Sequence, residues 1–98
     1  MARVELAPEV AGDIERILAH LEAFDSSDAA GRIAEIVAAI DALVHNPQIG
    51  RPREDGMREL VIGRDERGYL TLYRYIDALD LALVLAIRGQ REAGYSGS

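Results

Sequence analysis

Hydrophobic and polar residues alternate most regularly in the last third of the chain. Residues 69–76 and 81–88 each alternate with a period of two, and residues 77–80 separate the two runs. Successive side chains of a strand point to opposite faces of a sheet, so this pattern predicts a β-hairpin. The second run is apolar on both faces, which is typical of a central strand that is covered on both sides. We expect the rest of the chain to pack around this hairpin.

Strict alternation also assigns the side chains of the hairpin to faces. The first run places Tyr69, Tyr73 and Tyr75 on one face. The second run places alternate residues together, with Leu81, Leu83, Leu85 and Ile87 on one face and Ala82, Val84, Ala86 and Arg88 on the other. The tyrosines could stack on nucleic-acid bases, but a stripe of aromatic residues on a strand more often packs in a core, and we expect that here.

The first half of the chain shows helical periodicity. Residues 2–7 alternate weakly and predict a short strand. Pro8 can open a helix, and the apolar spacing that follows predicts an amphipathic helix over residues 8–23, with a polar face that carries Asp13, Glu15, Arg16 and Glu22. A second helix follows the capping residues at 25–28 and ends near Val44, before Asn46 and Pro47. The short connection predicts an antiparallel helical hairpin.

The remaining segments complete a single domain. Residues 47–56 hold two prolines and two glycines and predict a loop, and residues 57–62 predict a strand. The resulting order, β-α-α-β-β-β, indicates an α+β fold in which a mostly antiparallel sheet carries the helical hairpin on one face. A length of 98 residues suits one domain over residues 1–98.

Composition narrows the possible functions. The net charge is −6, and residues 1–49 hold nine acidic side chains against three arginines. Tight, sequence-independent binding of nucleic acid usually needs a net basic domain, so the charge disfavours it. The chain has no cysteine, and His20 and His45 lack the spacing of metal ligands, so we expect no metal or cofactor. No apolar run is long enough for a membrane span or signal peptide, which predicts a soluble cytoplasmic protein.

Five short motifs carry a resemblance to a known family. They are Leu-Ala-Pro-Glu at 6–9, Asn-Pro-x-x-Gly-Arg at 46–51, Gly-Met-Arg-Glu-Leu at 56–60, Gly-Tyr-x-x-x-Tyr-Arg-Tyr at 68–75 and Arg-x-Gln-Arg-Glu-Ala-Gly-Tyr at 88–95. In this order and at these distances they resemble the RelE/ParE superfamily of toxins from type II toxin–antitoxin (plasmid stabilisation) systems. The resemblance implies a protein that inhibits growth and is neutralised by a cognate antitoxin in a hetero-oligomer.

The superfamily has two branches with different targets. The resemblance implies either a RelE-like enzyme that cuts mRNA on the ribosome or a ParE-like toxin that poisons DNA gyrase. RNA cleavage needs groups that move protons and stabilise the phosphorane, which RelE-like toxins supply as cationic side chains and a C-terminal tyrosine. Arg58, Arg91 and Tyr95 match such positions, but Leu70 and Gly89 stand where catalytic members carry basic residues. Glycine has no side chain that could move a proton, so we expect the ParE-like function.

Alternatives remain. The chain could be a RelE-like endoribonuclease altered at Gly89, either natively or by an inactivating substitution, or a non-toxic relative that only binds the antitoxin. Arg74 lies among apolar residues, and because an unpaired buried guanidinium costs several kcal/mol, it must pair with an acid or reach solvent; we expect an ion pair. The residues after the last strand could form a target-contacting cluster or a solvated tail. The candidate target- or antitoxin-binding residues are Arg51, Arg58, Arg74, Arg88, Arg91 and Tyr95.

Overall fold

The computed structural model describes residues 1–24, 28–63 and 68–89. Its elements, in chain order, are β1 (Arg3–Leu6), α1 (Pro8–Phe24), α2 (Ala29–Ala42), β2 (Arg51–Pro52), β3 (Arg58–Ile62), β4 (Tyr69–Ile76), the 3₁₀ helix η3 (Asp77–Leu79) and β5 (Leu81–Gly89). This order confirms the predicted α+β arrangement. The structure adds β2, which lies inside the segment predicted as a loop.

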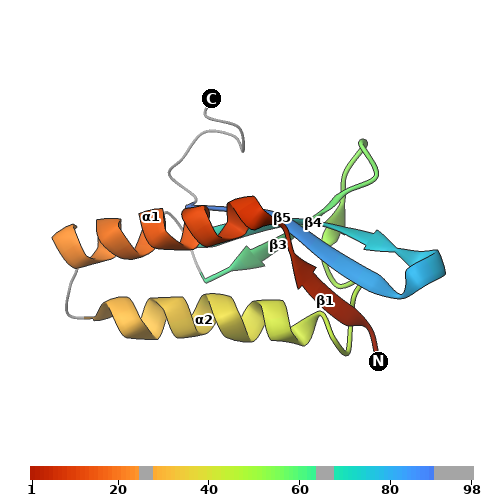
Figure 1. Cartoon of the computed structure of the whole chain (residues 1–98), viewed down its shortest axis with the longest axis horizontal. Helices are drawn as coiled ribbons and strands as arrows, with labels where there is room; N and C mark the ends of the chain where they lie inside the picture. The colour runs from red at the N-terminus through yellow and green to blue at the C-terminus, as the bar shows by residue number, and fades with distance from the viewer. Residues whose placement is uncertain (25–27, 64–67, 90–98) are drawn as a thin grey trace.

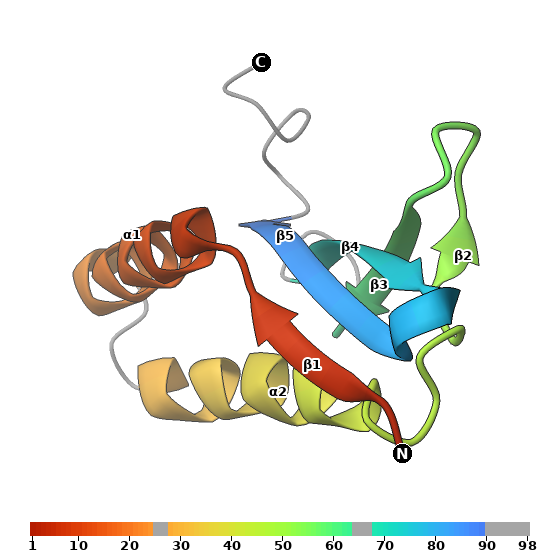
Figure 2. The same ribbon diagram turned by 45° about the vertical axis from the view of Figure 1, so that its right-hand side comes forward.

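The five strands form one sheet in the order β1-β5-β4-β3-β2 (Figure 1). β1 and β5 are parallel, and all other neighbours are antiparallel. The two helices run antiparallel and lie side by side against one face of the sheet (Figure 2). β5 is an inner strand of the sheet, as predicted, because it lies between β1 and β4. Both described helices lie on one face of the sheet, as predicted, and no described helix covers the second face.

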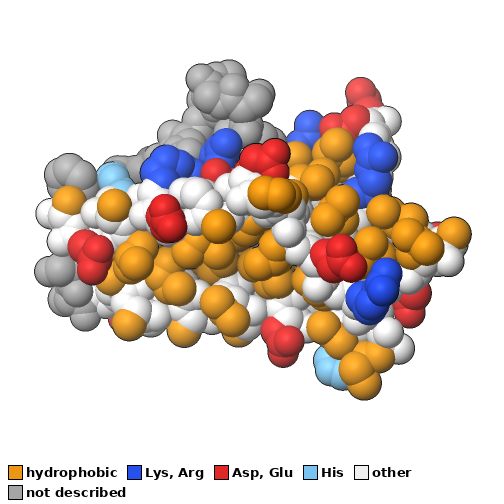
Figure 3. Space-filling model, in the orientation of Figure 1, with side chains coloured by type: hydrophobic (Ala, Val, Ile, Leu, Met, Phe, Trp, Pro, Cys, Tyr) orange, Lys and Arg blue, Asp and Glu red, His pale blue; other side chains and the backbone are white. Residues whose placement is uncertain are grey.

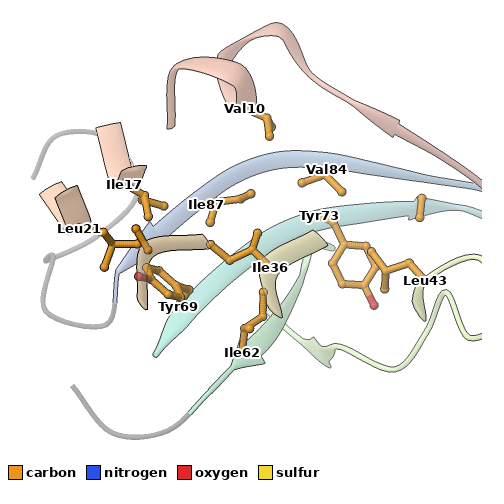
Figure 4. Close-up of a cluster of buried hydrophobic side chains, with 12 residues drawn as sticks. Val10, Ile17, Leu21, Ile36, Leu43, Ile62, Tyr69, Tyr73, Val84 and Ile87 are labelled. Carbon is orange, nitrogen blue, oxygen red and sulfur yellow. The ribbon is translucent and has the colours of Figure 1, made fainter. Parts of the chain in front are cut away.

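The core lies between the helices and the sheet. Its largest fully buried side chains come from both helices and the sheet, and they include Val10 of α1, Ile36 of α2, and Tyr73, Val84 and Ile87 of the sheet (Figure 4). Tyr69 also belongs to this cluster, and the half-buried Tyr75 packs against it. The tyrosines are therefore core residues, as expected, and not an exposed stacking platform.

A β-bulge interrupts the alternation of β5. Leu72 of β4 pairs with Ala86, but the next residue, Tyr73, pairs with Val84. The extra residue on β5 is Leu85, and an extra residue reverses the faces of all those that follow it. Ile87 consequently joins Val84 in the core, and the strict alternation predicted for β5 was wrong beyond the bulge.

The turn between β4 and β5 is tied to the start of the chain. Asp80 ends η3 in the left-handed region, with φ of 46°. Its backbone carbonyl accepts a hydrogen bond from the backbone N–H of Arg3 at 2.9 Å. Its carboxylate accepts a hydrogen bond from the Tyr75 hydroxyl at 2.7 Å. The turn therefore fixes the register in which β1 joins β5. Within the described ranges, neither helix combines the length and hydrophobicity that a membrane-crossing helix needs.

Candidate functional site

Arg58, a predicted catalytic and binding residue, holds a loop in place. It begins β3, and its side chain reaches back to the segment that joins α2 to β2. Its Nη1 donates hydrogen bonds to the backbone carbonyl of Gln48 at 3.0 Å and to that of Gly50 at 2.8 Å. These two bonds fix the position of the loop relative to the sheet.

Tyr73 holds the same loop from the neighbouring strand. It is the cross-strand partner of Arg58, and its hydroxyl accepts a hydrogen bond from the Gly50 N–H at 2.8 Å. Both backbone groups of Gly50 are thus occupied, one by each side chain. Burial raises the pKa of the Tyr73 phenol, although the Gly50 hydrogen bond and the charge of Arg58 lower it in part. We call Arg58, Tyr73 and Gly50 the loop clamp.

The loop clamp requires glycine at position 50 for reasons of space. A Cβ atom added to Gly50 would lie 2.6 Å from Cε1 and 2.7 Å from the hydroxyl oxygen of Tyr73. Contacts this short are essentially never seen, and the phenol cannot move away without losing its hydrogen bond. The lack of space beside Tyr73 therefore explains the glycine of the Asn-Pro-x-x-Gly-Arg motif at 46–51.

Arg51 and Arg74, two predicted binding residues, are both open to solvent. The Arg51 side chain is 72% exposed, and its Nη2 lies 3.7 Å from Oε1 of Glu59. Such an exposed pair contributes little to stability. Arg74 is exposed, and no acid of the described ranges forms an ion pair with it. The expected structural ion pair is absent there, so Arg74 takes the alternative that the sequence allowed and reaches solvent.

Arg88, another predicted binding residue, is engaged by a buried acid of α1. Asp13 is only 8% exposed. Its Oδ1 accepts a hydrogen bond from Nη1 of Arg88, and its Oδ2 accepts one from the Ile87 N–H at 3.0 Å. Arg16, one helical turn later, donates to the Ile87 carbonyl at 3.2 Å and lies 3.6 Å from Oδ1 of Asp13. We call Asp13, Arg16 and Arg88 the edge cluster.

The edge cluster provides hydrogen-bond partners for β5 beyond the point where β1 ends. β1 pairs with β5 only as far as Leu6 and Val84, after which the chain turns into α1. Ala7 still donates to the Val84 carbonyl at 2.8 Å. Beyond that point, the N–H and carbonyl of Ile87 would be unpaired at the sheet edge, and buried backbone groups without partners are costly. Asp13 and Arg16 supply the acceptor and the donor.

Sequence reasoning placed Asp13 on the polar face of α1, and the structure corrects this. Asp13 lies three residues after Val10 and four before Ile17, both of which are buried. That spacing puts Asp13 in the apolar stripe of the helix. The spacing was therefore the feature of the sequence that could have indicated its burial. A carboxylate in such a stripe needs a partner, but the sequence does not say which of the arginines provides it.

The structure brings the predicted site residues together in two separate groups. Arg58 belongs to the loop clamp, and Arg88 belongs to the edge cluster. Gly89 ends β5 opposite Tyr69. Arg91 and Tyr95 lie outside the described residues, so the predicted catalytic set cannot be assembled from the described part of the chain. In that part, no group of three or more acidic or histidine side chains is placed to hold a metal ion.

Comparison with known proteins identifies the family. Residues 4–94 match the family model described as the ParE toxin of the type II toxin–antitoxin system parDE. A solved structure of the chromosomal ParDE system from P. aeruginosa has a TM-score of 0.75 at 24% identity, covering 91% of this chain and 96% of that one. A mutant of the E. coli toxin RelE in the free state has a TM-score of 0.61 at 12% identity, covering 93% of this chain and 86% of that one.

These two structural likenesses concern the fold alone because both identities are low. Among curated proteins, none matches this sequence. The family model covers nearly the whole described domain and includes the loop clamp and the edge cluster. The chain therefore belongs to the ParE family of toxins from type II toxin–antitoxin systems.

Proposed function

We propose that this protein inhibits growth by engaging DNA gyrase and that a cognate antitoxin neutralises it. The observation that carries the proposal is the match of residues 4–94 to the ParE toxin family. In the superfamily that the sequence resembles, the ParE branch is the one that poisons gyrase. The P. aeruginosa relative is likewise described as part of a ParDE toxin–antitoxin system.

The state of the arginines supports binding over RNA cleavage. A catalytic guanidinium must be able to contact the scissile phosphate. Nη1 of Arg58 donates to two loop carbonyls instead. Gly89 offers no side chain at the position where cleaving relatives carry a basic one. In the described part of the chain, the groups that RNA cleavage would use are therefore either engaged or missing.

The proposal is tested by expressing the protein without antitoxin in bacteria. DNA synthesis and protein synthesis are followed by pulse labelling, and the Gly89→His variant is induced in parallel as the matched control. Gyrase poisoning predicts early loss of DNA synthesis with a DNA-damage response for both proteins. In vitro, the purified protein is expected to increase double-strand cleavage of supercoiled plasmid by gyrase.

Other outcomes would contradict the proposal in distinct ways. Early loss of protein synthesis, confined to Gly89→His, would identify a ribonuclease whose active site had been altered at Gly89. Loss of protein synthesis with both proteins would indicate a ribonuclease that does not need a side chain there. Normal growth with both proteins would favour a relative that only binds the antitoxin.

A further inference from the structure

The face of the sheet that points away from the helices carries apolar side chains on all three inner strands. Core residues such as Ile62, Tyr73 and Ala82 point toward the helices. Because successive residues of a strand point to opposite faces, the residues next to them point away. Those that are exposed or half-buried on this second face are Val61 of β3, Leu70, Arg74 and Ile76 of β4, and Leu83 of β5. We call these five residues the outer patch.

The strand register makes the outer patch continuous. Val61 lies opposite Leu70, and Arg74 lies opposite Leu83. Residues that are opposite each other on neighbouring strands are in side-chain contact distance on the same face. No described helix covers this face (Figure 2), and Val61 is 48% exposed. Exposed apolar side chains that adjoin one another in this way are typical of a binding surface.

Arg74 is the single charged residue of the outer patch. It projects from β4, which is the middle strand of the five. Its side chain is exposed, and no acid of the described ranges forms an ion pair with it. The planar guanidinium matches a carboxylate in a bidentate, charge-assisted pair. The patch therefore presents a donor for a carboxylate in the middle of an apolar surface.

Ion pairs border the outer patch on both sides. On β1, Arg3 lies 3.8 Å from Glu5, which is opposite Leu83. On the other side, Arg51 of β2 lies 3.7 Å from Glu59 of β3. Protein–protein interfaces commonly have an apolar centre that is enriched in arginine and a polar rim. The second face of the sheet has this arrangement, and the charges of its rim balance each other.

The helical side of the molecule has a different charge. Helices α1 and α2 hold six acidic side chains against two arginines. Figure 3 shows acidic side chains distributed over the side that carries both helices. A partner surface that presents carboxylates is repelled there by like charge. Such a partner is therefore directed to the sheet.

We infer that the outer patch binds a protein surface that presents a carboxylate among apolar side chains. The inference rests on the proposed function, since gyrase is the protein expected to supply that surface. Nucleic acid is disfavoured because phosphate binding relies on several cations, and the patch offers only Arg74. A second copy of this chain is disfavoured because stacking two middle strands face to face would bring two Arg74 side chains together.

The inference is tested by measuring the affinity of the full-length protein for purified gyrase holoenzyme. The chain has no lysine, so an amine-reactive dye labels only the terminal amine, and fluorescence anisotropy follows binding. Arg74→Glu and Val61→Asp should each weaken binding at least about tenfold, as expected for residues at the centre of an interface. Arg74→Lys keeps the charge and should lose less than Arg74→Glu.

Val37→Asp is the matched control, because Val37 is an equally exposed valine of α2, at 55%. It should leave the affinity for gyrase unchanged, and circular dichroism checks that each variant is folded. A crosslinking measurement does not depend on weakened binding. Replacing Val61 by the photoreactive residue p-benzoylphenylalanine should give a covalent product with a gyrase subunit on illumination, and the same replacement of Val37 should give none.

Each contrary outcome has its own meaning. Unchanged affinity of both Arg74→Glu and Val61→Asp, with gyrase still bound and poisoned, would overturn the inference and leave the proposed function standing. Failure of the unaltered protein to bind gyrase would refute both. Binding to plasmid without gyrase that is lost in Arg74→Glu and kept in Val61→Asp would identify nucleic acid as the occupant. A dimer in sedimentation that Val61→Asp dissociates would identify a second copy.

Discussion

Replacing Arg58 by methionine separates a structural role from a role at the target. The Arg58→Met change keeps the aliphatic stem and removes the guanidinium that donates to Gly50 at 2.8 Å and to Gln48 at 3.0 Å. The bond to Gly50 is partly buried, and the bond to Gln48 is exposed to water. Hydrogen bonds from charged donors contribute about 1.5–3 kcal/mol, and water replaces much of an exposed one, so we expect the free energy of unfolding to fall by about 1–2 kcal/mol.

Tyr73→Phe probes the other half of the loop clamp. It preserves the buried ring and removes only the hydroxyl that accepts from the Gly50 N–H. A buried donor left without an acceptor costs about 1–3 kcal/mol. Both side chains hold the same glycine. Once one substitution has freed the loop, the second substitution should therefore cost less stability than it does alone. We expect the double variant to lose about 0.5–1 kcal/mol less than the sum of the two single losses.

Urea unfolding followed by far-UV circular dichroism suits a chain that has no tryptophan. For a denaturant slope of about 1–2 kcal/mol per M, a loss of 1.5 kcal/mol lowers the midpoint by about 1 M. Arg74→Met is the matched control, because Arg74 is an exposed arginine of the adjacent strand and should change stability by no more than about 0.5 kcal/mol. If Arg58→Met abolished toxicity with an unchanged midpoint, Arg58 would act at the target. Additive losses in the double variant would equally refute the shared clamp.

Three further predictions concern buried or coupled polar groups. Asp13→Ala should lower the free energy of unfolding by about 3 kcal/mol, measured by urea unfolding, because it removes the buried carboxylate that accepts from Arg88 and from the Ile87 N–H; a loss below about 1 kcal/mol would contradict the edge cluster. Thr71→Val should raise the free energy of unfolding by about 1 kcal/mol, measured by urea unfolding, because the fully buried Thr71 hydroxyl finds no hydrogen-bond partner among the described residues. The hydrogen bond to Asp80 raises the pKa of Tyr75 to about 12, so the stability it provides is present below the ordinary pKa of about 10 and is lost as the pH rises through 12. Asp80→Asn should return the Tyr75 pKa toward 10 in an ultraviolet titration, and an unchanged pKa would show that the carboxylate does not cause the shift.

The order of the elements could be predicted from the sequence because it follows from local pattern. Period-two runs marked β4 and β5, and Pro8 with the apolar spacing after it marked α1. β2 was missed because it contains only two residues, Arg51 and Pro52. It is a strand only because it pairs with β3, and its own composition is that of a loop. The sequence therefore predicted a loop for that segment.

The bulge and the edge cluster escaped prediction for a related reason. Nothing in the residues around Leu85 announces an extra position, since a bulge is defined only against the neighbouring strand. The pairing of Asp13 with Arg88 joins positions 75 residues apart. Periodicity describes the surroundings of a residue along its own element and cannot choose among distant arginines, so the buried acid was detectable but its partner was not.

The parallel pairing of β1 with β5 has a consequence for synthesis of the protein. The first strand of the chain finds its only described strand neighbour in the last strand, so contacts of very long sequence separation close the sheet. Such topologies fold slowly. On a ribosome that adds about 5–20 residues per second, β1 waits several seconds without its partner. A messenger RNA truncated before the codons for β5 would therefore yield a chain that cannot fold, even if all the preceding elements were translated.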